Sequence, residues 1–463
     1  MTAVIGLGLA VTLVGCSSDD AEEADPSGAA AGGGALTVWI QEDLPDRVAA
    51  TQAIVEEFTA ATGTEVELVP VAEDQFAQVL TSSAAAGDLP DVIGGISLPQ
   101  VRTLSANELV DTEATAALLE SLGEDTFSKR ALELTSDGDS QLALPSESWA
   151  QLLYYRTDLF EAAGLEPPTT YDDILAAAEA LDSPEVSGFV GANSPGDAFT
   201  EQTFEHIALG NGCELVDDTG EVLLDSPECV AAFQFYGDLV SDYSVPGAQD
   251  VDTTRASYFA GQAAMFIWST FVLDEMAGLR ADALPTCAEC AEDPAFLARN
   301  TGVVTAIAGP DGSEPAQFGE ITSWALTAGS DTVPASAFVE YMMSDGYVPW
   351  LEIAPEGKVP VRQGTAENPT EFSEAWTTLE VGVDTKAPLS DFYTADVLDR
   401  LAAGPEEIAR WAIPQGQGDL LGGMQGESPV AGAVSEVTSG DVDAQSVAEE
   451  AAETVRSVQD SLR

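Results

Sequence analysis

The sequence predicts an α/β fold in which strands and helices alternate along the chain. The apolar run LTVWI at 36–40 is typical of a buried strand. Apolar side chains spaced i, i+1, i+4 and i+7 from Ile54 then lie on one face of a helix, which is expected to stop at Gly63. TEVELVPV and PDVIGGI predict two further strands, with the helical segment DQFAQVLTSSAAAG between them. The short joints indicate a parallel sheet with right-handed crossovers.

Polar residues follow two of these strands where the chain leaves the sheet. In open parallel sheets, ligands bind at the loops beyond the carboxyl ends of the strands. Glu42 and Asp43 come after the first strand, and Ser97 comes after the third. We therefore expect these three residues to face a ligand.

A second unit is predicted from about Leu152 onward. In PPTTYDDILAAAEAL, Thr170 is a candidate N-cap with Asp173 three residues later, at the start of a helical pattern. Further helical patterns span 200–210 and 228–241, and GQAAMFIW at 261–268 ends as an apolar strand. A chain of 463 residues, 45% of them hydrophobic, can form the cores of two domains.

The first 34 residues predict an export and anchoring segment. Residues 1–15 contain an uncharged apolar run that is too short to span a bilayer and matches the apolar core of a signal peptide. The residues LVGC, ending at Cys16, resemble the bacterial lipobox, whose cysteine receives a diacylglycerol. Residues 16–34 then predict a lipidated flexible tether. The alternative is a buried apolar helix that happens to contain Cys16.

The charge balance excludes several classes of partner. The chain has 80 Asp and Glu against 15 Lys and Arg, a formal net charge of −65. Such a surface argues against nucleic acid as a partner, and against docking onto anionic lipid by charge. It suggests a protein that stays soluble at high salt, where screening weakens self-repulsion.

The remaining four cysteines form two local pairs. Cys213 and Cys229 flank a turn-centred segment, and Cys287 and Cys290 form CAEC. Outside the membrane, such pairs indicate disulfides. The alternatives for CAEC are a redox pair or half of a zinc site, but the chain has a single histidine, His206, to complete one. We therefore expect two structural disulfides, no metal and no cofactor.

Several stretches in a fixed order resemble one protein family. They are GDLPDVI, LALPSESWAQLLYYRTDLFEAAGLEPPTTYDDILAAAEAL, YFAGQAAMFIWST and APEGKVPVR. Over about residues 35–430 the chain resembles the extracellular solute-binding proteins of sugar-type ABC importers, family 1, which are maltose-binding-like. Two positions depart from the family pattern: Ser269 stands near a usual glycine, and Arg156 replaces a usual asparagine.

The resemblance implies a two-lobed periplasmic-binding-protein type II fold with hinge-connected parallel and mixed sheets. By analogy, one lobe holds 35–148 and 308–357, and the other holds 149–307 and 358–463. It also implies a monomer, lipid-anchored at the extracellular face of the cell membrane. This protein would capture a sugar or oligosaccharide in the interlobe cleft and deliver it to ABC transporter permease subunits.

A sugar cleft needs aromatic faces for stacking and polar side chains to pair the hydroxyls. Trp149, Trp268 and Trp324 fall at expected interlobe positions, although each could equally be a core residue. Lys358 and Arg362 are unusual cations in so acidic a chain. They could pair the ligand's hydroxyls, pair a ligand carboxylate, or hold the hinge by a salt bridge. The predicted ligand-binding residues are Glu42, Asp43, Ser97, Glu147, Trp149, Trp268, Ser269, Thr322, Trp324, Lys358 and Arg362.

Two alternatives to sugar capture stay open. A secreted carbohydrate-active hydrolase would use two carboxylates, and the many acidic residues supply candidate pairs without discrimination. The sequence has no GxSxG, HExxH or Walker motif, so no catalytic residue is predicted. The other alternative is a binder of a non-sugar solute on the same fold.

Overall fold

The computed structural model describes residues 35–463. The predicted signal peptide, the lipid on Cys16 and the tether lie outside the described residues. Within 35–463, no helix combines the length and the apolar character needed to cross a bilayer.

The three predicted N-terminal strands are confirmed, and they form a parallel sheet. They are β1 (Leu36–Gln41), β2 (Val66–Val71) and β3 (Val92–Ile96), with β1 paired to both of the others. The helices α1 (Pro45–Thr62) and α2 (Glu73–Ala86) make the crossovers. The αL conformation of Gly63, at φ 78°, ends α1 as predicted. We call these three strands the β1 group.

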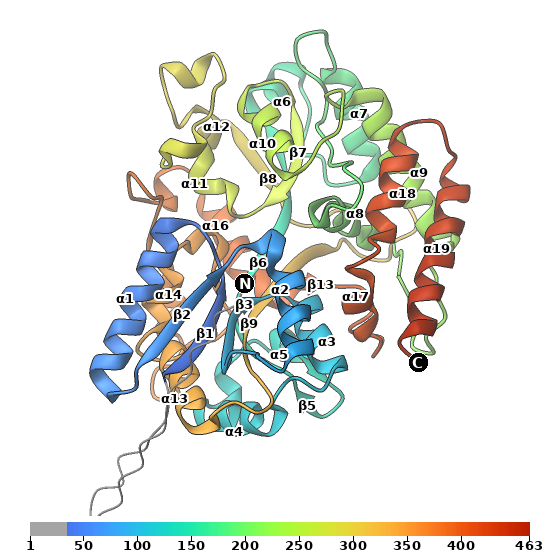
Figure 1. Ribbon diagram of the computed structural model, residues 1–463. Coiled ribbons are helices and arrows are strands. Elements are labelled where there is room, and N and C mark those ends of the chain that lie inside the picture. Colours follow the sequence, from blue (N-terminus) through green and yellow to red (C-terminus); the bar gives the residue numbers. More distant parts are fainter. Residues whose placement is uncertain (1–34) are drawn as a thin grey trace, which may run out of the picture. The chain divides into compact units, whose positions relative to one another are not determined.

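Two long strands connect the β1 group to a second set of strands (Figure 1). The first half of β6 (Leu144–Arg156) pairs with β9 (Gln317–Leu326), and β9 pairs with β3. The second half of β6 pairs with β7 (Met265–Ser269) and β8 (Thr301–Val304), here called the β7 group. The short strands β10 (Val359–Pro360) and β13 (Ile408–Ala409) flank β6 and β9.

Helices cover both groups of strands, and two small hairpins complete the fold. The other helices are α3 (Leu98–Ala106), α4 (Thr112–Leu122), α5 (Lys129–Leu134), α6 (Thr157–Ala163), α7 (Tyr171–Leu181), α8 (Ala198–Gly210), α9 (Pro227–Tyr243), α10 (Val251–Phe259), α11 (Val272–Met276), α12 (Phe296–Arg299), α13 (Thr332–Met342), α14 (Tyr347–Leu351), α15 (Glu371–Trp376), α16 (Ala395–Glu407), α17 (Asp419–Met424), α18 (Pro429–Thr438) and α19 (Ala444–Ser461). The hairpins pair β4 (Ser136–Asp137) with β5 (Ser140–Gln141), and β11 (Glu380–Val381) with β12 (Ala387–Pro388).

Local sequence signals place several of these helices correctly. The capping box of α7 forms as predicted, with 3.2 Å bonds from the Asp173 N–H to Thr170 Oγ1 and from the Thr170 N–H to an Asp173 carboxylate oxygen. The helical patterns at 200–210 and 228–241 correspond to α8 and α9. The C-terminal helix α19 buries a stripe of Ala and Val against α18 and α9.

The core continues from one group of strands to the other. One hydrophobic cluster contains Val38 and Phe58 beside the β1 group, and Phe266 and Trp268 from β7. A second cluster joins α7, α8 and α9 to α18 and α19, and a third lies under α2 and α3. The strands β6 and β9 therefore cross a region that is buried on both sides.

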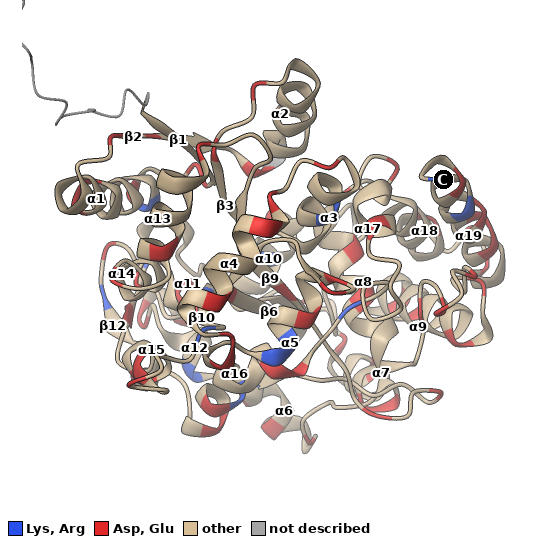
Figure 2. Ribbon diagram, turned by 90° about the horizontal axis from the view of Figure 1, so that it is seen from below, with Lys and Arg blue, Asp and Glu red and all other residues tan. Residues whose placement is uncertain are grey.

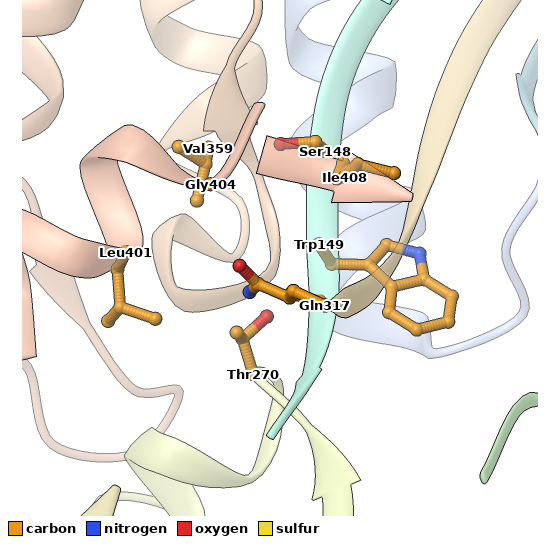
Figure 3. A pocket seen from close by; sticks show the side chains of 9 residues that line it. Ser148, Trp149, Thr270, Gln317, Val359, Leu401, Gly404 and Ile408 are labelled. Carbon is orange, nitrogen blue, oxygen red and sulfur yellow. The ribbon is translucent and has the colours of Figure 1, made fainter. Parts of the chain in front are cut away.

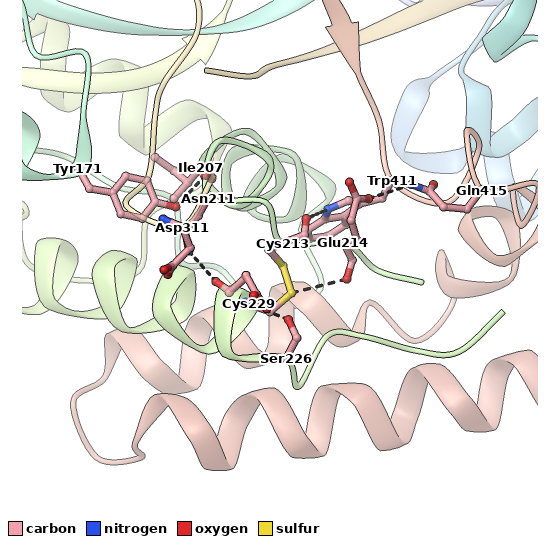
Figure 4. The surroundings of a disulfide bond; sticks show 11 residues. Tyr171, Ile207, Asn211, Cys213, Glu214, Ser226, Cys229, Asp311, Trp411 and Gln415 are labelled. Atoms are coloured by element: carbon pink, nitrogen blue, oxygen red, sulfur yellow. Dashed lines mark hydrogen bonds between the residues drawn. A yellow bond between two sulfur atoms is a disulfide. The ribbon is translucent and has the colours of Figure 1, made fainter. Parts of the chain in front are cut away.

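Both predicted disulfides are confirmed. The Cys213–Cys229 bond joins the chain just after α8 to the first turn of α9, and Cys287–Cys290 closes the loop before α12. Figure 4 shows the first disulfide beside Trp411, whose indole N–H donates to the carbonyl oxygen of Cys213 at 2.7 Å. The α8–α9 corner is thereby tied to the segment that follows β13.

Acidic side chains dominate the surface. Figure 2 shows Asp and Glu on many helices and only scattered Lys and Arg. Most of the basic side chains lie in ion pairs, largely with exposed or half-exposed carboxylates. Exposed pairs of this kind contribute little to stability. The few buried cations mark the places where charge is used inside the fold.

Candidate functional site

Two of the predicted site residues meet in a buried ion pair. Lys358 Nζ lies 2.9 Å from Glu147 Oε1, while the indole N–H of Trp350 donates to Glu147 Oε2 at 2.8 Å. The same ammonium lies 3.7 Å from the centroid of the Trp350 ring. Of the three roles expected for Lys358, the structure therefore shows the salt bridge, and its partner Glu147 lies in the first half of β6.

Arg362 uses its whole guanidinium inside the protein. Its Nη2 donates to the carbonyl oxygen of Leu122 at 2.8 Å, its Nη1 donates to that of Met343, and its Nε donates to Thr126 Oγ1 at 3.3 Å. The group is buried between the rings of Phe127 and Phe372. This arginine holds α4, α13 and the segment after β10 together.

The three predicted tryptophans differ in environment. Trp324 is 1% exposed and packs against Phe338 and Trp350, so it is a core residue. Trp268 is also buried, and its indole N–H donates to the carbonyl oxygen of Val251 at 3.0 Å. Trp149 is partly exposed on β6, with its ring centroid 6.1 Å from that of Phe318. Of the three rings, that of Trp149 is the one available to a ligand.

Close packing explains why Trp324 is inaccessible. Gly94 in β3 lies directly under its ring, and a Cβ at that position would come within 2.1 Å of the ring. A glycine is therefore required for the ring to lie flat on the strand. The position of Trp324 on β9 is set by packing within the β1 group.

Of the loop residues predicted from the parallel sheet, Ser97 caps a helix, and Glu42 and Asp43 lie in the loop before α1. Glu42 accepts from the Asp43 and Leu44 N–H groups and pairs with Arg47 at 3.4 Å, before the start of α1. Asp43 is exposed on the same loop. Ser97 is the N-cap of α3 and forms a capping box with Gln100. These residues lie at the carboxyl ends of β1 and β3, as expected.

The two remaining predicted residues lie on the strands beside β6. The carbonyl oxygen of Ser269, at the end of β7, accepts from the Tyr154 hydroxyl at 3.2 Å. Thr322 on β9 donates to the carbonyl oxygen of Glu147 at 3.5 Å. Both residues are partly exposed.

A buried network that the sequence analysis did not identify joins α8, β9 and α3. Arg410 Nε lies 3.2 Å from Glu205 Oε1, and its Nη1 lies 2.7 Å from Glu320 Oε2. The other oxygen of Glu320 accepts from the N–H of Leu98, at the start of α3, at 2.8 Å. The Trp411 N–H donates to Glu205 at 2.8 Å. All three charged side chains are buried.

The electrostatics of this network follow from its burial. Burial raises the pKa of Glu205, and Arg410 opposes that rise. Although burial alone would lower it, Glu320 and Glu205 raise the pKa of Arg410. One turn before Glu205, burial and the charge of Glu205 raise the pKa of Glu201 to about 7. The one sequence signal for this network was the scarcity of cations: with 15 Lys and Arg in the chain, Arg410 was a candidate for a buried charge pair.

A second unpredicted cluster joins the start of α1 to α11. The guanidinium of Arg47 lies 5.3 Å from the centroid of the Phe271 ring, and Arg255 pairs with Glu275 at 3.0 Å. One carboxylate oxygen of Asp274 and one of Glu356 are buried without a hydrogen-bond partner. Burial, with Glu356 and Glu275 nearby, raises the pKa of Asp274 well above its ordinary range. This cluster connects the β1 group to the β7 group.

Unpaired polar groups gather on and beside β6, just beyond its pairing with β9. Both polar atoms of Gln151 are buried without a partner, and so are the hydroxyls of Thr200 and Thr203 on α8, which packs on β6. Gln151 lies on the same face of β6 as Trp149. Unpaired buried amides and hydroxyls carry a free-energy cost that a polar ligand or water can remove. We call this side of β6, with Trp149, Gln151 and the neighbouring Thr200 and Thr203 of α8, the Trp149 face. It has the residue types that bind hydroxyls.

The opposite face of β6 holds a small cavity (Figure 3). Gln317 and Thr270 point toward one another there, and Trp149 points away from them. Its volume is about 10 Å³, room for about one water molecule. A larger cavity of about 680 Å³ runs along β8, between the residues before α7 and the start of α16. None of the predicted ligand-binding residues lines that larger cavity. Within 35–463, no three His, Cys, Asp or Glu side chains are arranged to hold a metal.

The chain is similar in sequence to a large family. The family model of bacterial extracellular solute-binding proteins matches residues 41–349. The chain belongs to this family. The predicted extracellular solute-binding function is therefore confirmed at the level of the family.

Relatives of this solute-binding protein include bacterial and archaeal proteins. It is 28% identical over 315 residues to YcjN of Escherichia coli, a protein assigned to the periplasmic-binding proteins of ABC transporters; the match covers 66% of this chain and 68% of YcjN. It is 24% identical over 249 residues to the maltotriose-binding protein of Pyrococcus abyssi, covering 51% and 50% of the two chains.

Solved structures share the fold of this solute-binding protein. The GacH receptor of Streptomyces glaucescens superposes with a TM-score of 0.69 at 19% identity, over 92% of this chain and 98% of GacH. The laminaribiose-bound sugar transporter of Arthrobacter chlorophenolicus superposes with a TM-score of 0.70 at 20% identity, over 92% and 99%. The predicted two-lobed type II periplasmic-binding-protein fold is confirmed.

Proposed function

We propose that this solute-binding protein captures a sugar or oligosaccharide between its lobes and delivers it to the permease of an ABC transporter. The observation that carries the proposal is the Trp149 face of β6. A partly exposed indole lies there on the same face as an unpaired, buried Gln151 amide. Aromatic stacking and amide hydrogen bonds together suit a polyhydroxylated ligand. Relatives named for maltotriose, laminaribiose and acarbose binding support this class of ligand.

The proposed lobes are 35–148 with 308–357, and 149–307 with 358–463. The continuous strand β6 supports this division, because it passes from one proposed lobe to the other at 148–149, and a hinge must lie on a chain segment shared by both lobes. Closure around a ligand then shifts a population toward the state that the ligand binds better. The protein is proposed to act as a monomer without catalysis, anchored outside the membrane through a lipid on Cys16.

The test is calorimetric titration of the wild type and of Trp149→Ala, after a thermal-shift screen of neutral sugars. We expect the substitution to weaken binding roughly tenfold, equivalent to about 1.4 kcal/mol. The matched control is Tyr243→Ala, which removes a partly exposed ring from α9 and should leave affinity unchanged. Equal binding by wild type and Trp149→Ala would remove this face from the site.

Two further results would decide between the alternatives. Turnover of the bound sugar would favour a hydrolase, and binding of a non-sugar solute alone would favour the other ligand class. Intact mass measurement of the membrane-extracted protein tests the anchor, since a diacylglycerol adds a defined mass to Cys16. Release of Cys16→Ser into the medium is the expected companion result.

A further inference from the structure

The Trp149 face borders a group of carboxylates around one arginine. Glu320 lies directly opposite Trp149 where β9 pairs with β6, so the two side chains lie on the same side of the sheet. The centroid of the Phe318 ring lies 6.1 Å from that of Trp149, and the guanidinium of Arg410 lies 4.7 Å from the Phe318 centroid. Arg410 pairs with Glu320 at 2.7 Å and with Glu205 of α8 at 3.2 Å. These charges therefore lie next to the proposed solute site.

Carboxylates outnumber cations in this group. Glu201 lies one helical turn before Glu205, and its pKa responds to the charges of Glu205 and Arg410. Glu214 also lies near Glu205, since burial and the charge of Glu205 raise the pKa of Glu214 to about 7. We call Glu201, Glu205, Glu214, Glu320 and Arg410 the Glu201 cluster. Its one cation, Arg410, already pairs with two carboxylates, and within 35–463 neither Glu201 nor Glu214 lies in an ion pair.

Glu201 is the member of this cluster whose carboxylate lacks a partner. The other three carboxylates accept hydrogen bonds from N–H groups. In the described part of the chain, no hydrogen bond or ion pair involves the carboxylate of Glu201, which is partly exposed. The dipole of α8 favours an acid in its first turn, but burial and Glu205 outweigh it, because the pKa of Glu201 is raised. This carboxylate is therefore open to a charged donor from outside the chain.

Unpaired hydrogen-bond acceptors accompany Glu201 on the Trp149 face. The hydroxyls of Thr200 and Thr203, on either side of Glu201 in α8, are buried without a partner, and so is the Gln151 amide on β6. Each of these groups can accept a hydrogen bond. The indole of Trp149 adds an aromatic face, which attracts a cation through its ring quadrupole. The Trp149 face and the Glu201 cluster thus offer acceptors, negative charge and an indole to one ligand.

The overall acidity of the chain does not account for the Glu201 cluster. Exposed carboxylates are solvated by water, and salt screens their mutual repulsion. Burial removes both effects, so excess negative charge inside the fold is unfavourable. Glu205 and Glu320 of this cluster are among the few acidic side chains that are buried between 35 and 463, which are Glu147, Glu205, Asp274, Glu275, Glu320 and Glu356.

We infer that the solute captured at the Trp149 face carries an ammonium group, as an amino sugar does, and that this group binds at Glu201. The inference rests on the proposed function, because it names the class of sugar that the proposed site takes. An ammonium group supplies three hydrogen-bond donors and one positive charge, which the unpaired acceptors and the Glu201 cluster lack. A neutral sugar supplies donors but leaves the negative charge uncompensated. A sugar acid adds a further negative charge and is repelled.

Matched pairs of sugars test the inference by titration calorimetry at pH 6. The pairs are glucosamine with glucose, galactosamine with galactose, and the β-1,4-linked dimer of glucosamine with cellobiose. We expect the ammonium member of at least one pair to bind the wild type at least tenfold more tightly. Glu201→Gln keeps the shape of the side chain but removes its charge, and should lose most of this preference. The matched control is Glu120→Gln, which removes the same charge from an exposed position on α4 and should keep it.

Proton release locates the ammonium group. Burial and Glu205 raise the pKa of Glu201 to about 7, so its carboxyl group is partly protonated at pH 6 in the free protein. A neighbouring ammonium favours the charged form, so binding should release protons. Titration in two buffers of different ionisation enthalpy should show this release for the wild type with the amino sugar, and less of it for Glu201→Gln. Equal release by the two proteins would place the ammonium elsewhere and overturn the inference.

Further outcomes separate this inference from the proposed function. Neutral sugars that bind as tightly as their amino partners would overturn the inference and leave sugar capture standing. Ethanolamine, an ammonium compound without a sugar ring, is the additional probe. If it binds, none of the six sugars binds, and Glu201→Gln abolishes its binding, the ammonium site is confirmed and sugar capture is wrong. Binding by none of the seven compounds would overturn the inference, while the neutral-sugar screen with Trp149→Ala still decides the proposed function.

Discussion

Lys358 Nζ lies 2.9 Å from Glu147 Oε1, and this ion pair is buried where β10 pairs with β6. The Trp350 ring covers the ammonium on one side, and its indole N–H satisfies the second oxygen of Glu147. A buried pair of this kind is stable only because both partners are present. Removing one partner leaves an uncompensated charge away from water.

Single substitutions at this pair should therefore be strongly destabilising. We expect Glu147→Gln or Lys358→Met to lower the free energy of unfolding by about 3 to 5 kcal/mol. The double variant should lose clearly less than either single variant, because it leaves no unpaired charge. Urea unfolding of the four proteins measures this cycle. Additive losses would show that the two groups do not depend on one another.

The two disulfides should differ in their contribution to stability. Cys213–Cys229 spans 16 residues and Cys287–Cys290 spans 3. In the chain-entropy model, removing the first with paired Cys→Ser substitutions costs about 3 kcal/mol, and removing the second costs about 1.5 kcal/mol less. Chemical unfolding of the two double variants tests this order. A larger loss from the shorter loop would contradict the entropic explanation.

The contact between α17 and α3 depends on a missing side chain. A Cβ at Gly422 would meet both the backbone and the hydroxyl of Thr103. We expect Gly422→Ala to lower the free energy of unfolding by about 1 to 3 kcal/mol, because it forces the helices apart. Gly432→Ala in α18 is the matched control, since nothing lies within 4 Å of its Cβ position. The control should be neutral or more stable by up to about 1 kcal/mol.

Buried carboxylic acids predict a pH dependence of stability. Burial raises the pKa of Glu356 from 4.5 to about 7. Because the folded value is higher than the unfolded value, the folded state binds more protons between about pH 4.5 and 7. The stabilisation is fully present below the unfolded pKa and is lost as pH rises through the folded one. The free energy of unfolding should therefore fall over this window.

His206 contributes with the opposite sign and must be separated from this effect. Burial lowers its pKa from 6.5 to about 3, so its contribution to stability is present above pH 6.5 and is lost as pH falls. We expect Glu356→Gln to have a flatter pH profile between pH 5 and 8 than the wild type. Urea unfolding at unit pH steps gives both profiles. Identical slopes would mean that Glu356 does not titrate in this range.

The sequence by itself determined the local elements of this protein. The apolar run LTVWI, the helix ending at Gly63 and the later strands predicted the β1 group, because apolar runs, helical period and turn residues are local signals. The Thr170 capping box and both disulfides were predicted for the same reason: their partners are close in sequence. The ordered stretches also indicated the family and the two-lobed fold.

Only the tertiary structure decided which side chains of the paired strands β6 and β9 are buried. Periodicity could not show that Trp324 lies over Gly94 in the core while Trp149 stays accessible, because that depends on packing between strands far apart in sequence. Nor could it pair Arg410 with Glu205 and Glu320, which lie 205 and 90 positions away. In a chain with 80 acidic residues, every arginine has many possible partners. Burial selects among them, since an unpaired charge inside the fold is too unfavourable to persist.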